Sequence, residues 1–516
     1  VMPTTPAAIA TGSPESTAAG KRIAHLGGNA ADIAVGAALT ATVSEILFAS
    51  LGGAAFVMCK MPGQSAELID GGDAMPTLPP VESRDPKGWF TANIAYGGGI
   101  EIRGGHAAVG VPGALAALEL AWKRHGSLPW GEIVAPAVEL SRRTYPAGKT
   151  MAAWLAVSGK VLFFPQQASR ACFFPDGESP VTEGRPFTIP DMPETLDQIA
   201  REGASALYQG DLAVAFSKEM LSNGGFVTRA DLRGYEPEIR SPLSLKSGGF
   251  SMALNPPPSV GGSALATLVR AAENAPWPRE STAEQISLLA RCQQGLVELR
   301  RGKKTFSGFD SSFAAELLQR NDLTEVHTSL KSPSTTHISV TTADGGSVSL
   351  TMSMGYGSGV TIPGTGIACN NSLGEPELNP RGFFAIASGD RLISNMAPTL
   401  AWHPKDGRTL AIGSPGADRI TTVIGQTWLN VALTGLPFEE AVAAPRLHVE
   451  RLKDRFRVLY EPGIDGSLLG AKWELRPFEE KHMYFGAVKL TGIDSNGKLK
   501  AVADPRRHGE AIVTEF

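Results

Sequence analysis

The most informative segment of the chain covers residues 331–354 and reads KSPSTTHISVTTADGGSVSLTMSM. A polar loop at its start leads into a strand predicted over residues 337–342. A strong hairpin-turn signal follows at Asp344-Gly345-Gly346, and a return strand is predicted over residues 348–354. The segment therefore predicts an antiparallel hairpin that begins just after a proline-containing loop.

Two hydroxyl side chains are expected to meet in this hairpin. A register counted from the turn places Ser353 opposite Thr336, at the loop end of the first strand. Ser353 is therefore expected close to Thr335, which is a candidate nucleophile. Taken alone, a Ser/Thr cluster of this kind is more often a plain polar loop, so the assignment depends on the rest of the chain.

A predicted helix start further along the chain offers hydrogen-bond donors. Gly416 and Ala417 precede a helix predicted over residues 419–433, with Asp418 as its N-cap. Small residues leave backbone N–H groups accessible, and a helix N-terminus adds unsatisfied donors and positive partial charge. Such donors suit a tetrahedral oxyanion. The alternative is an ordinary Gly-rich turn with an N-cap.

The remaining segments favour layers of helices and sheets. A long buried helix is predicted over residues 17–45 with a break at Gly27-Gly28-Asn29, and the Phe- and Pro-rich residues 155–190 are expected to be irregular. Strand-like segments are residues 359–370 and 408–413, with edge strands expected at 487–491 and 499–502. Helices, then a strand-rich block, then a helix fit α+β layers of the αββα type better than alternating βαβ units.

Composition excludes several classes of protein. The chain has 516 residues, so two or three units or one large layered domain are expected. A net charge of -4 without a basic stripe argues against a nucleic-acid partner. No apolar run of 18 or more residues is present, so no membrane-spanning helix is expected. The first ten residues lack the features of a secretion signal, so a cytoplasmic location is expected, although such a signal could be absent from the sequence given.

The cysteines give no sign of a disulfide framework or a metal site. Cys59, Cys172, Cys292 and Cys369 are far apart and form no CxxC pattern. They are expected to be small buried hydrophobic residues. No metal cluster or nucleotide-binding loop is convincing elsewhere, so no cofactor and no metal are expected.

A series of ordered motifs runs along the whole chain. It comprises Gly27-Gly28-Asn29-Ala30, Leu51-Gly52-Gly53, Pro256-Pro257-Pro258-Ser259, Thr335-Thr336-His337-Ile338-Ser339-Val340, Asp344-Gly345, Gly366-Ile367, Asn370-Asn371, Met396-Ala397-Pro398-Thr399, Gly413-Ser414-Pro415-Gly416, Ala443-Ala444-Pro445-Arg446 and Asp504-Pro505-Arg506. In these motifs the chain resembles the γ-glutamyltranspeptidases and their relatives. The match covers nearly the full length and is far more specific than any single motif.

The resemblance implies a four-layer αββα N-terminal-nucleophile (Ntn) hydrolase that cuts itself. Thr335 would attack the carbonyl of Ser334, which would give a large subunit of residues 1–334 and a small subunit of residues 335–516 that stay packed together. Cleavage would free the α-amine of Thr335, whose usual pKa of about 7.7–8.0 suits a general base.

The resemblance also implies roles for other residues of the site. Ser353 matches a hydroxyl that hydrogen-bonds the nucleophile. The N–H groups of Gly416 and Ala417 match oxyanion donors. Ser394 and Asn395 match a pair of serines that line the site.

The chain departs from the family pattern where the γ-glutamyl group is bound. Gly72 stands where members acting on glutathione carry an arginine for the α-carboxylate. Gly355 replaces an asparagine, Glu375 aligns with an aspartate that binds the substrate amine, and Asn395 replaces a serine. These changes predict that the catalytic machinery is kept while the substrate differs, because a charge-assisted clamp worth roughly 1.5–3 kcal/mol per bond is lost.

Three further residues near these positions have open roles. Arg103 or Arg391 could supply a replacement cation, although a solvated surface arginine is the more frequent case for each. His337 could help to position Thr335, although a buried structural histidine is the more frequent case.

Several functions remain open at this point. The favoured one is hydrolysis of a small non-glutamyl amide by an amidohydrolase or acylase. The alternatives are hydrolysis of a C–C bond next to a carbonyl, as in relatives from 4-alkylproline biosynthesis, true γ-glutamyl hydrolysis or transfer, and an unprocessed pseudoenzyme that only binds. All need a small-molecule substrate, and all but the last need the nucleophile, the base and the oxyanion site.

Overall fold

The computed structural model describes most of the chain, namely residues 4–79, 86–95, 99–275, 277–278, 282–302, 335–452 and 455–514. Ser334, on the N-terminal side of the expected cleavage bond, lies outside the described residues, whereas Thr335 is the first residue of a strand.

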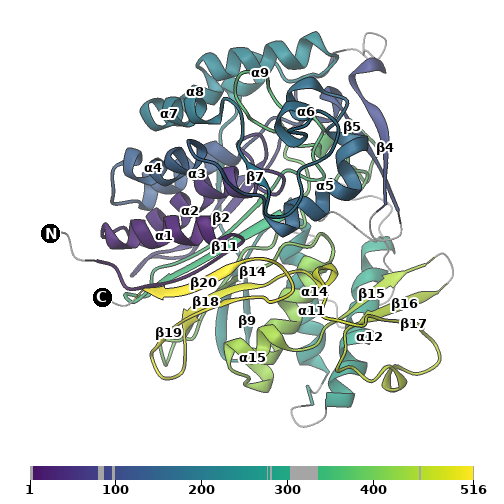
Figure 1. Ribbon diagram of the computed structural model, residues 1–516. Helices are drawn as coiled ribbons and strands as arrows, with labels where there is room; N and C mark the ends of the chain where they lie inside the picture. Colours follow the sequence, from purple (N-terminus) through teal and green to yellow (C-terminus); the bar gives the residue numbers. More distant parts are fainter. Residues whose placement is uncertain are drawn as a thin grey trace.

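Two antiparallel sheets lie face to face at the centre of the molecule (Figure 1). The first sheet has the strand order β20 (Glu510–Thr514), β1 (Ala7–Thr11), β11 (Thr335–Thr342), β12 (Ser347–Ser353), β2 (Ala54–Lys60), β3 (Glu67–Gly71) and β8 (Glu238–Arg240). The second has the order β19 (Leu499–Ala503), β18 (Lys489–Ile493), β14 (Thr409–Gly413), β13 (Thr399–Trp402), β10 (Phe250–Leu254) and β9 (Leu243–Ser247). The hairpin β11–β12 contacts β14 and thus lies where the two sheets meet.

Helices cover the outer face of each sheet (Figure 1). On the first sheet lie α1 (Pro14–His25), α2 (Ala30–Ser44), α3 (Ala114–His125) and α4 (Trp130–Ser141), followed by α5 (Lys149–Leu162), α6 (Gln167–Phe173), α7 (Met192–Glu202), α8 (Ser205–Tyr208), α9 (Asp211–Ser222) and α10 (Arg229–Gly234) on the same side. On the second lie α11 (Val260–Asn274), α12 (Thr282–Gly302), α14 (Arg419–Leu429) and α15 (Phe438–Ala443). The predicted αββα class is confirmed.

Smaller sheets complete the structure at its periphery. They are β4 (Phe90–Ile94) with β5 (Ile100–Gly104), β6 (Tyr145–Pro146) with β7 (Pro186–Phe187), and the three strands β15 (Leu447–Arg451), β16 (Phe456–Tyr460) and β17 (Glu474–Pro477).

The helix α2 shows how the sequence produces this layering. All of its residues are buried, because alanine and β-branched residues occur on every side and the helix is enclosed by α1, α4 and the hairpin strands. The predicted break at Gly27-Gly28-Asn29 separates it from α1. Asn29 caps α2 by accepting hydrogen bonds from the N–H groups of Ala31 and Asp32 at 2.9 and 3.1 Å.

For three segments the predicted secondary structure was wrong. Residues 155–190 contain α6 and most of α5, because Trp154, Leu155 and Leu162 recur at helical spacing and bury one face despite the nearby phenylalanines. Residues 359–370 form an irregular segment with isolated bridges, because its glycines, Gly359 among them, take positive φ values. The strand β18 is not an edge strand, since it pairs with β14 and β19.

The helix predicted over residues 419–433 is confirmed as α14, which continues in a π-helical turn at Asn430–Thr434. Asp418 precedes it as predicted, but its side chain does not cap the helix. The carboxylate instead binds Nη1 of Arg419 at 2.7 Å. The Asp418 side chain therefore does not fix the backbone just before α14, as an ordinary N-cap would.

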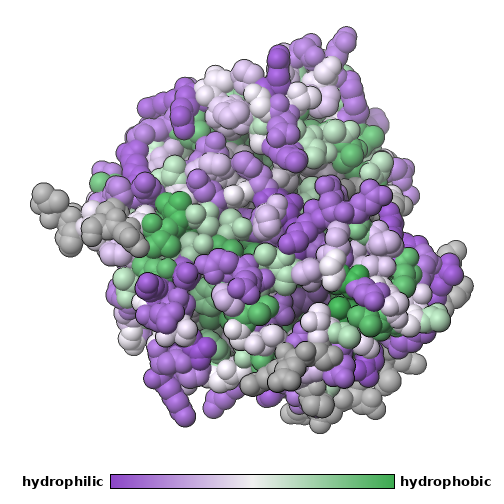
Figure 2. Space-filling model, turned by 60° about the horizontal axis from the view of Figure 1, so that its bottom comes forward, coloured by the Kyte–Doolittle hydropathy of each residue, from purple (hydrophilic) through white to green (hydrophobic). Residues whose placement is uncertain are grey.

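The surface mixes polar and apolar residues. Figure 2 shows hydrophilic residues over much of one face, with smaller hydrophobic areas between them. Within the described ranges, no helix is long and apolar enough to cross a membrane. The cysteines at 59, 172, 292 and 369 are free and buried, in agreement with the expectation that they are small core residues.

Candidate active site

The hairpin brings Thr335 and Ser353 directly opposite each other. The sequence-based register placed Ser353 opposite Thr336 and is wrong by one residue. The turn is a three-residue loop rather than a two-residue one: the N–H of Thr342 donates to the carbonyl of Gly346 at 2.8 Å, and Gly345 has a φ of 88°. In the observed register the two hydroxyls are hydrogen-bonded, because Thr335 Oγ1 donates to Ser353 Oγ at 3.3 Å.

A cavity opens at this end of the hairpin, with an empty volume of about 620 Å³. It brings together the predicted residues Thr335, Ser353, Gly72, Gly355, Glu375, Ser394, Asn395 and Ala417, and its wall also includes Ala54, Phe56, Asp73, Ser372, Glu377, Leu378, Leu392, Ile393, Met396 and Ile420. Residues from β2, β11, β12, the start of α14 and several loops therefore surround one hydroxyl.

The predicted oxyanion donors lie in a loop between β14 and α14. Ala417 lines the cavity, whereas Gly416 lies behind it, next to Gly486. Ala417 has a φ of 57° and Gly416 one of 134°. A left-handed backbone costs a non-glycine residue free energy, so the surroundings enforce this conformation. No described residue accepts a hydrogen bond from either N–H. Both N–H groups are thus unpaired within the described residues, and the one at the cavity wall is that of Ala417.

Acidic side chains form one wall of the cavity. Asp73 directly follows Gly72 after the end of β3, and burial raises the pKa of its carboxyl to about 7. Burial, helped by the neighbouring charges of Glu377 and Asp73, raises the pKa of Glu375 well above its ordinary value. No lysine, arginine or histidine is among the described residues that line this cavity.

The two arginines considered as replacement cations are committed elsewhere. The Arg391 guanidinium lies 4.2 Å from the centre of the Tyr235 ring and donates to the carbonyl of Glu236. It lines a neighbouring cavity rather than the one that holds Thr335. Arg103 bonds Thr91 and lies over the half-buried ring of Trp89, outside the cavity. Neither guanidinium lines the Thr335 cavity, but the Arg391 side chain passes next to Gly72 and its charge partly lowers the pKa of Asp73, which burial raises.

A polar cluster anchors the strand behind Thr335. Thr336 points to the opposite face of the sheet from Thr335, and its hydroxyl contacts both carboxylate oxygens of Glu45 at 3.0 and 3.1 Å. Arg507 donates from Nη1 to the carbonyl of Thr335 at 3.1 Å. Burial raises the pKa of Glu45, which the positive charge of Arg507 partly offsets. Sequence reasoning missed Glu45 and Arg507, since nothing in the local pattern marks them.

His337 is a buried residue between the two sheets. Its Nδ1 lies 2.8 Å from the Thr351 hydroxyl and its Nε2 lies 3.0 Å from the Ser339 hydroxyl. Burial lowers the pKa of the imidazole to about 3, so the ring stays neutral at any ordinary pH. Both ring nitrogens bond other hydroxyls, and neither is hydrogen-bonded to Thr335. His337 therefore contributes to the packing between the two sheets.

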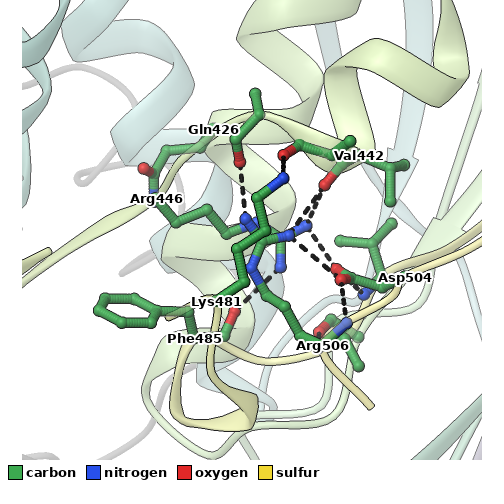
Figure 3. A network of polar contacts seen from close by, with 12 residues as sticks. Gln426, Val442, Arg446, Lys481, Phe485, Asp504 and Arg506 are labelled. Carbon is green, nitrogen blue, oxygen red and sulfur yellow. Dashed lines mark hydrogen bonds and ion pairs between the residues drawn. The ribbon is translucent and has the colours of Figure 1, made fainter. Parts of the chain in front are cut away.

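Two of the sequence motifs build a buried ionic network rather than the cavity (Figure 3). Arg446 binds Asp504 at 2.6 Å, and Arg506 binds Glu461 at 2.5 Å and Asp504 at 3.1 Å. Both arginines also donate to the carbonyl of Val442. The network ties α15 to the segment before β20 and so to the edge of the first sheet. None of these side chains lines the cavity of Thr335.

No candidate metal site accompanies the cavity. Across the part of the chain that the structure describes, no group of three or more His, Cys, Asp and Glu side chains is arranged to hold a metal ion. The cavity presents a hydroxyl, a neighbouring hydroxyl, the backbone donor of Ala417 and an acidic wall. These groups suit nucleophilic attack on a carbonyl.

Comparisons with known proteins agree with this reading. The family model for Gamma-glutamyltranspeptidase matches residues 16–514. The chain is 27% identical over 535 residues to the Glutathione hydrolase proenzyme of Escherichia coli K12, covering 96% of this chain and 90% of that protein. It is 29% identical over 467 residues to the Acylase ACY 1 proenzyme of Pseudomonas sp. strain V22, covering 86% and 82%.

A solved structure shows the same fold. The cephalosporin acylase from Bacillus halodurans superposes with a TM-score of 0.83 at 23% identity, covering 99% of this chain and 96% of that one.

Proposed function

Because the chain belongs to the gamma-glutamyltranspeptidase family and is an Ntn hydrolase, we propose that Thr335 cuts the chain and then hydrolyses a small amide that carries no γ-glutamyl group. The observation that carries the proposal is the cavity itself. It combines the hydroxyl of Thr335, the N–H of Ala417 and an acidic wall, without a basic residue among the described side chains that line it.

Self-cleavage uses the same nucleophile as turnover. Oγ1 of Thr335 attacks the carbonyl carbon of Ser334, and the C–N bond breaks, so that an ester replaces the peptide bond and the α-amine is freed. Water then hydrolyses the ester. This gives a carboxylate at Ser334, an N-terminal Thr335 and subunits of residues 1–334 and 335–516. Relatives described as proenzymes support this step.

Turnover follows once the amine is free. The neutral α-amine takes the hydroxyl proton as Oγ1 attacks the substrate carbonyl, and the N–H of Ala417 stabilises the oxyanion. The amine passes the proton to the leaving nitrogen, and the C–N bond breaks to leave an acyl ester on Thr335. Water, deprotonated by the same amine, releases the acid. Ser353 keeps the nucleophile hydroxyl oriented through its 3.3 Å hydrogen bond.

The residues that line the cavity argue for a substrate without a γ-glutamyl group. Gly72 offers no charge where the resemblance implies an arginine, and Arg391 and Arg103 bind other partners. An α-carboxylate would therefore lie next to Asp73 and Glu375, in a cavity whose described lining includes no cation. The relatives described as acylases support an acyl group other than γ-glutamyl.

The test begins with a denaturing gel and N-terminal sequencing. The wild type is expected to give two fragments, of which the smaller begins at Thr335, and Thr335→Ala is expected to stay as one chain. Purified processed protein is then offered p-nitroanilides with different acyl groups, γ-glutamyl among them. Hydrolysis with an acyl group trapped on Thr335 supports the proposal.

Two results would contradict it. A wild type that remains a single chain would exclude the self-cleaving mechanism and favour a binding protein. Rapid turnover of glutathione or γ-glutamyl-p-nitroanilide would show that the substrate is unchanged. Mass analysis of products from a metabolite screen separates amide hydrolysis from cleavage of a C–C bond, which would use the same threonine.

A further inference from the structure

The peptide bond between Gly416 and Ala417 is held in one orientation. Ala417 has a φ of 57°, which is a left-handed conformation that a non-glycine residue keeps only when its surroundings enforce it. The Gly416 carbonyl belongs to the same peptide unit as the Ala417 N–H, and it accepts a hydrogen bond from the N–H of Arg419 at 3.0 Å. The carbonyl and the N–H of a trans peptide point in opposite directions. The bond from Arg419 therefore also sets the direction of the Ala417 donor.

The Arg419 side chain ties this part of the loop to a neighbouring segment. It is only 1% exposed. Its Nε donates to the carbonyl of Tyr484 at 3.0 Å, and its guanidinium lies 4.6 Å from the centre of the Tyr484 ring. Its Nη1 binds Asp418 at 2.7 Å, so its charge is compensated inside the fold. The residue that holds the peptide carbonyl is thus itself fixed by several contacts.

A second contact holds the other end of the loop between β14 and α14. The Ser414 hydroxyl accepts from the N–H of Ala487 at 2.9 Å and donates to the carbonyl of the next residue at 2.7 Å. Between the two contacts Gly416 packs against Gly486, where an added Cβ on Gly416 would lie 3.2 Å from the Gly486 Cα. Residues 484–487 therefore hold the loop on both sides of the strained peptide.

The ionic network of Figure 3 in turn fixes the segment that holds the loop. Arg446 donates from Nη1 to the carbonyl of Phe485 at 3.1 Å (Figure 3). Oε1 of Glu461, another buried member of the network, accepts from the N–H of His482 at 3.2 Å. The network therefore reaches the loop through the backbone of residues 482–487, although it lies outside the cavity.

We propose that Arg419 and Ser414 are positioning residues that keep the Ala417 N–H directed at the oxyanion formed when Thr335 attacks. This inference rests on the proposed hydrolase function, in which that N–H stabilises the oxyanion. Neither side chain is among the described residues that line the cavity, so both act through the peptide and not on the substrate. Without these contacts the peptide would rotate to relieve its strain, and the donor would leave the place where charge develops. Their loss should therefore lower kcat rather than raise KM.

Two loop variants, Ser414→Ala and Arg419→Met, each remove one of these contacts. Both are assayed as processed protein with the p-nitroanilide that the wild type hydrolyses best. Since deleting an oxyanion donor outright costs about 10²–10³ in kcat, misplacing it is expected to lower kcat about 10–100-fold, with KM within about twofold of the wild type. Arg419→Lys keeps the charge beside Asp418 and is expected to retain more of the kcat than Arg419→Met.

A buried residue on the same helix provides the matched control, Gln426→Leu. The Gln426 side chain bonds the backbone N–H and carbonyl of Leu447 at 3.1 and 2.9 Å and touches no residue of the loop through these bonds. The control is expected to melt at a lower temperature than the wild type and to keep its kcat.

Hydrogen exchange tests the same contacts without a substrate. In the uncleaved Thr335→Ala chain, a fragment of residues 416–420 reports on the N–H groups of Arg419 and Ile420, which donate to carbonyls of the loop at 3.0 and 3.2 Å. Their exchange is expected to be at least about tenfold faster in the two loop variants and unchanged in the control.

The outcomes separate the positioning role from the function beneath it. Wild-type kcat in both loop variants, a rise in KM at constant kcat, or an equal loss of kcat in the control would refute the positioning role while the hydrolase stands. If processed wild type hydrolyses no p-nitroanilide, the hydrolase function fails, and unchanged exchange in the loop variants would refute the two contacts as well. A loop variant that stays uncleaved is judged by its exchange in the same way.

Discussion

Replacing Thr336 by valine tests whether the cluster behind the nucleophile holds Thr335 in place. The substitution keeps the β-branched shape and removes the hydroxyl that contacts Glu45 at 3.0 and 3.1 Å. After the proposed cleavage Thr335 would be a chain terminus, and termini fray unless they are tied down. The ties here are the Thr336–Glu45 contact and the bond from Arg507 to the Thr335 carbonyl at 3.1 Å.

The expected magnitude follows from the nature of this contact. A hydrogen bond to a charged group contributes roughly 1.5–3 kcal/mol, and its loss leaves a buried carboxyl with fewer donors. The free energy of unfolding of the uncleaved Thr335→Ala chain should therefore fall by about 1.5–3 kcal/mol. In the processed enzyme kcat should fall about tenfold or more with KM nearly unchanged, because the substrate does not touch Thr336.

A second threonine on the same strand is the control. Thr341 is also buried, and its hydroxyl lies 2.9 Å from that of Thr491, at the far end of β11 from the nucleophile. Thr341→Val should cost some stability and leave kcat intact, and Thr336→Ser should restore much of the activity. Equal losses of kcat in the Thr336 and Thr341 valine variants would refute a positioning role, because general destabilisation would then explain both.

Two further substitutions have expected outcomes. Gly355→Ala should abolish activity and lower stability, because Gly355 has a φ of 66° and an added Cβ would overlap Oε1 of Glu375. Gly345 has a φ of 88° and open space around it, so Gly345→Ala should lower the free energy of unfolding by only about 1 kcal/mol. Similar melting temperatures for the two variants would contradict the steric argument. The pKa of His337 is about 3 in the fold against about 6.5 unfolded, so its contribution to the free energy of unfolding is present above pH 6.5 and is lost as pH falls. At pH 5.5 the uncleaved chain should therefore lose about 1.4 kcal/mol of that free energy relative to its His337→Gln variant. Parallel curves of stability against pH for the two chains would show that the imidazole is not neutral in the fold.

The sequence was most informative where backbone geometry has a strong local signal. The turn at Asp344-Gly345 predicted the hairpin, and the small residues before α14 predicted a helix start near the nucleophile. The register was missed by one residue, because a two-residue and a three-residue loop share the same turn residues. Only the pairing of the two strands shows that Thr335 faces Ser353.

The sequence was least informative where the site depends on long-range contacts. Glu45, Thr336 and Arg507 meet only because α2, β11 and the segment before β20 lie side by side in the fold. Asp73 carries no motif beyond its place after β3, and its position on the wall of the Thr335 cavity appears only in the fold. Local periodicity contains no information of this kind.

Within this one cavity, the groups that the sequence predicted and the groups that it missed are positioned in two different ways. The groups proposed for bond breaking are set by backbone geometry: strand pairing places Thr335 against Ser353, and the left-handed turn presents Ala417. The groups proposed for substrate selection are side chains in irregular segments, Asp73 after the end of β3 and Glu375 after a short 3₁₀ turn. Exchanging such side chains leaves the strand pairing and the turn unaltered. It follows that Asp73→Asn should change which amide is hydrolysed and should leave self-cleavage intact, so the gel assay and the substrate assay report on separable parts of the same site.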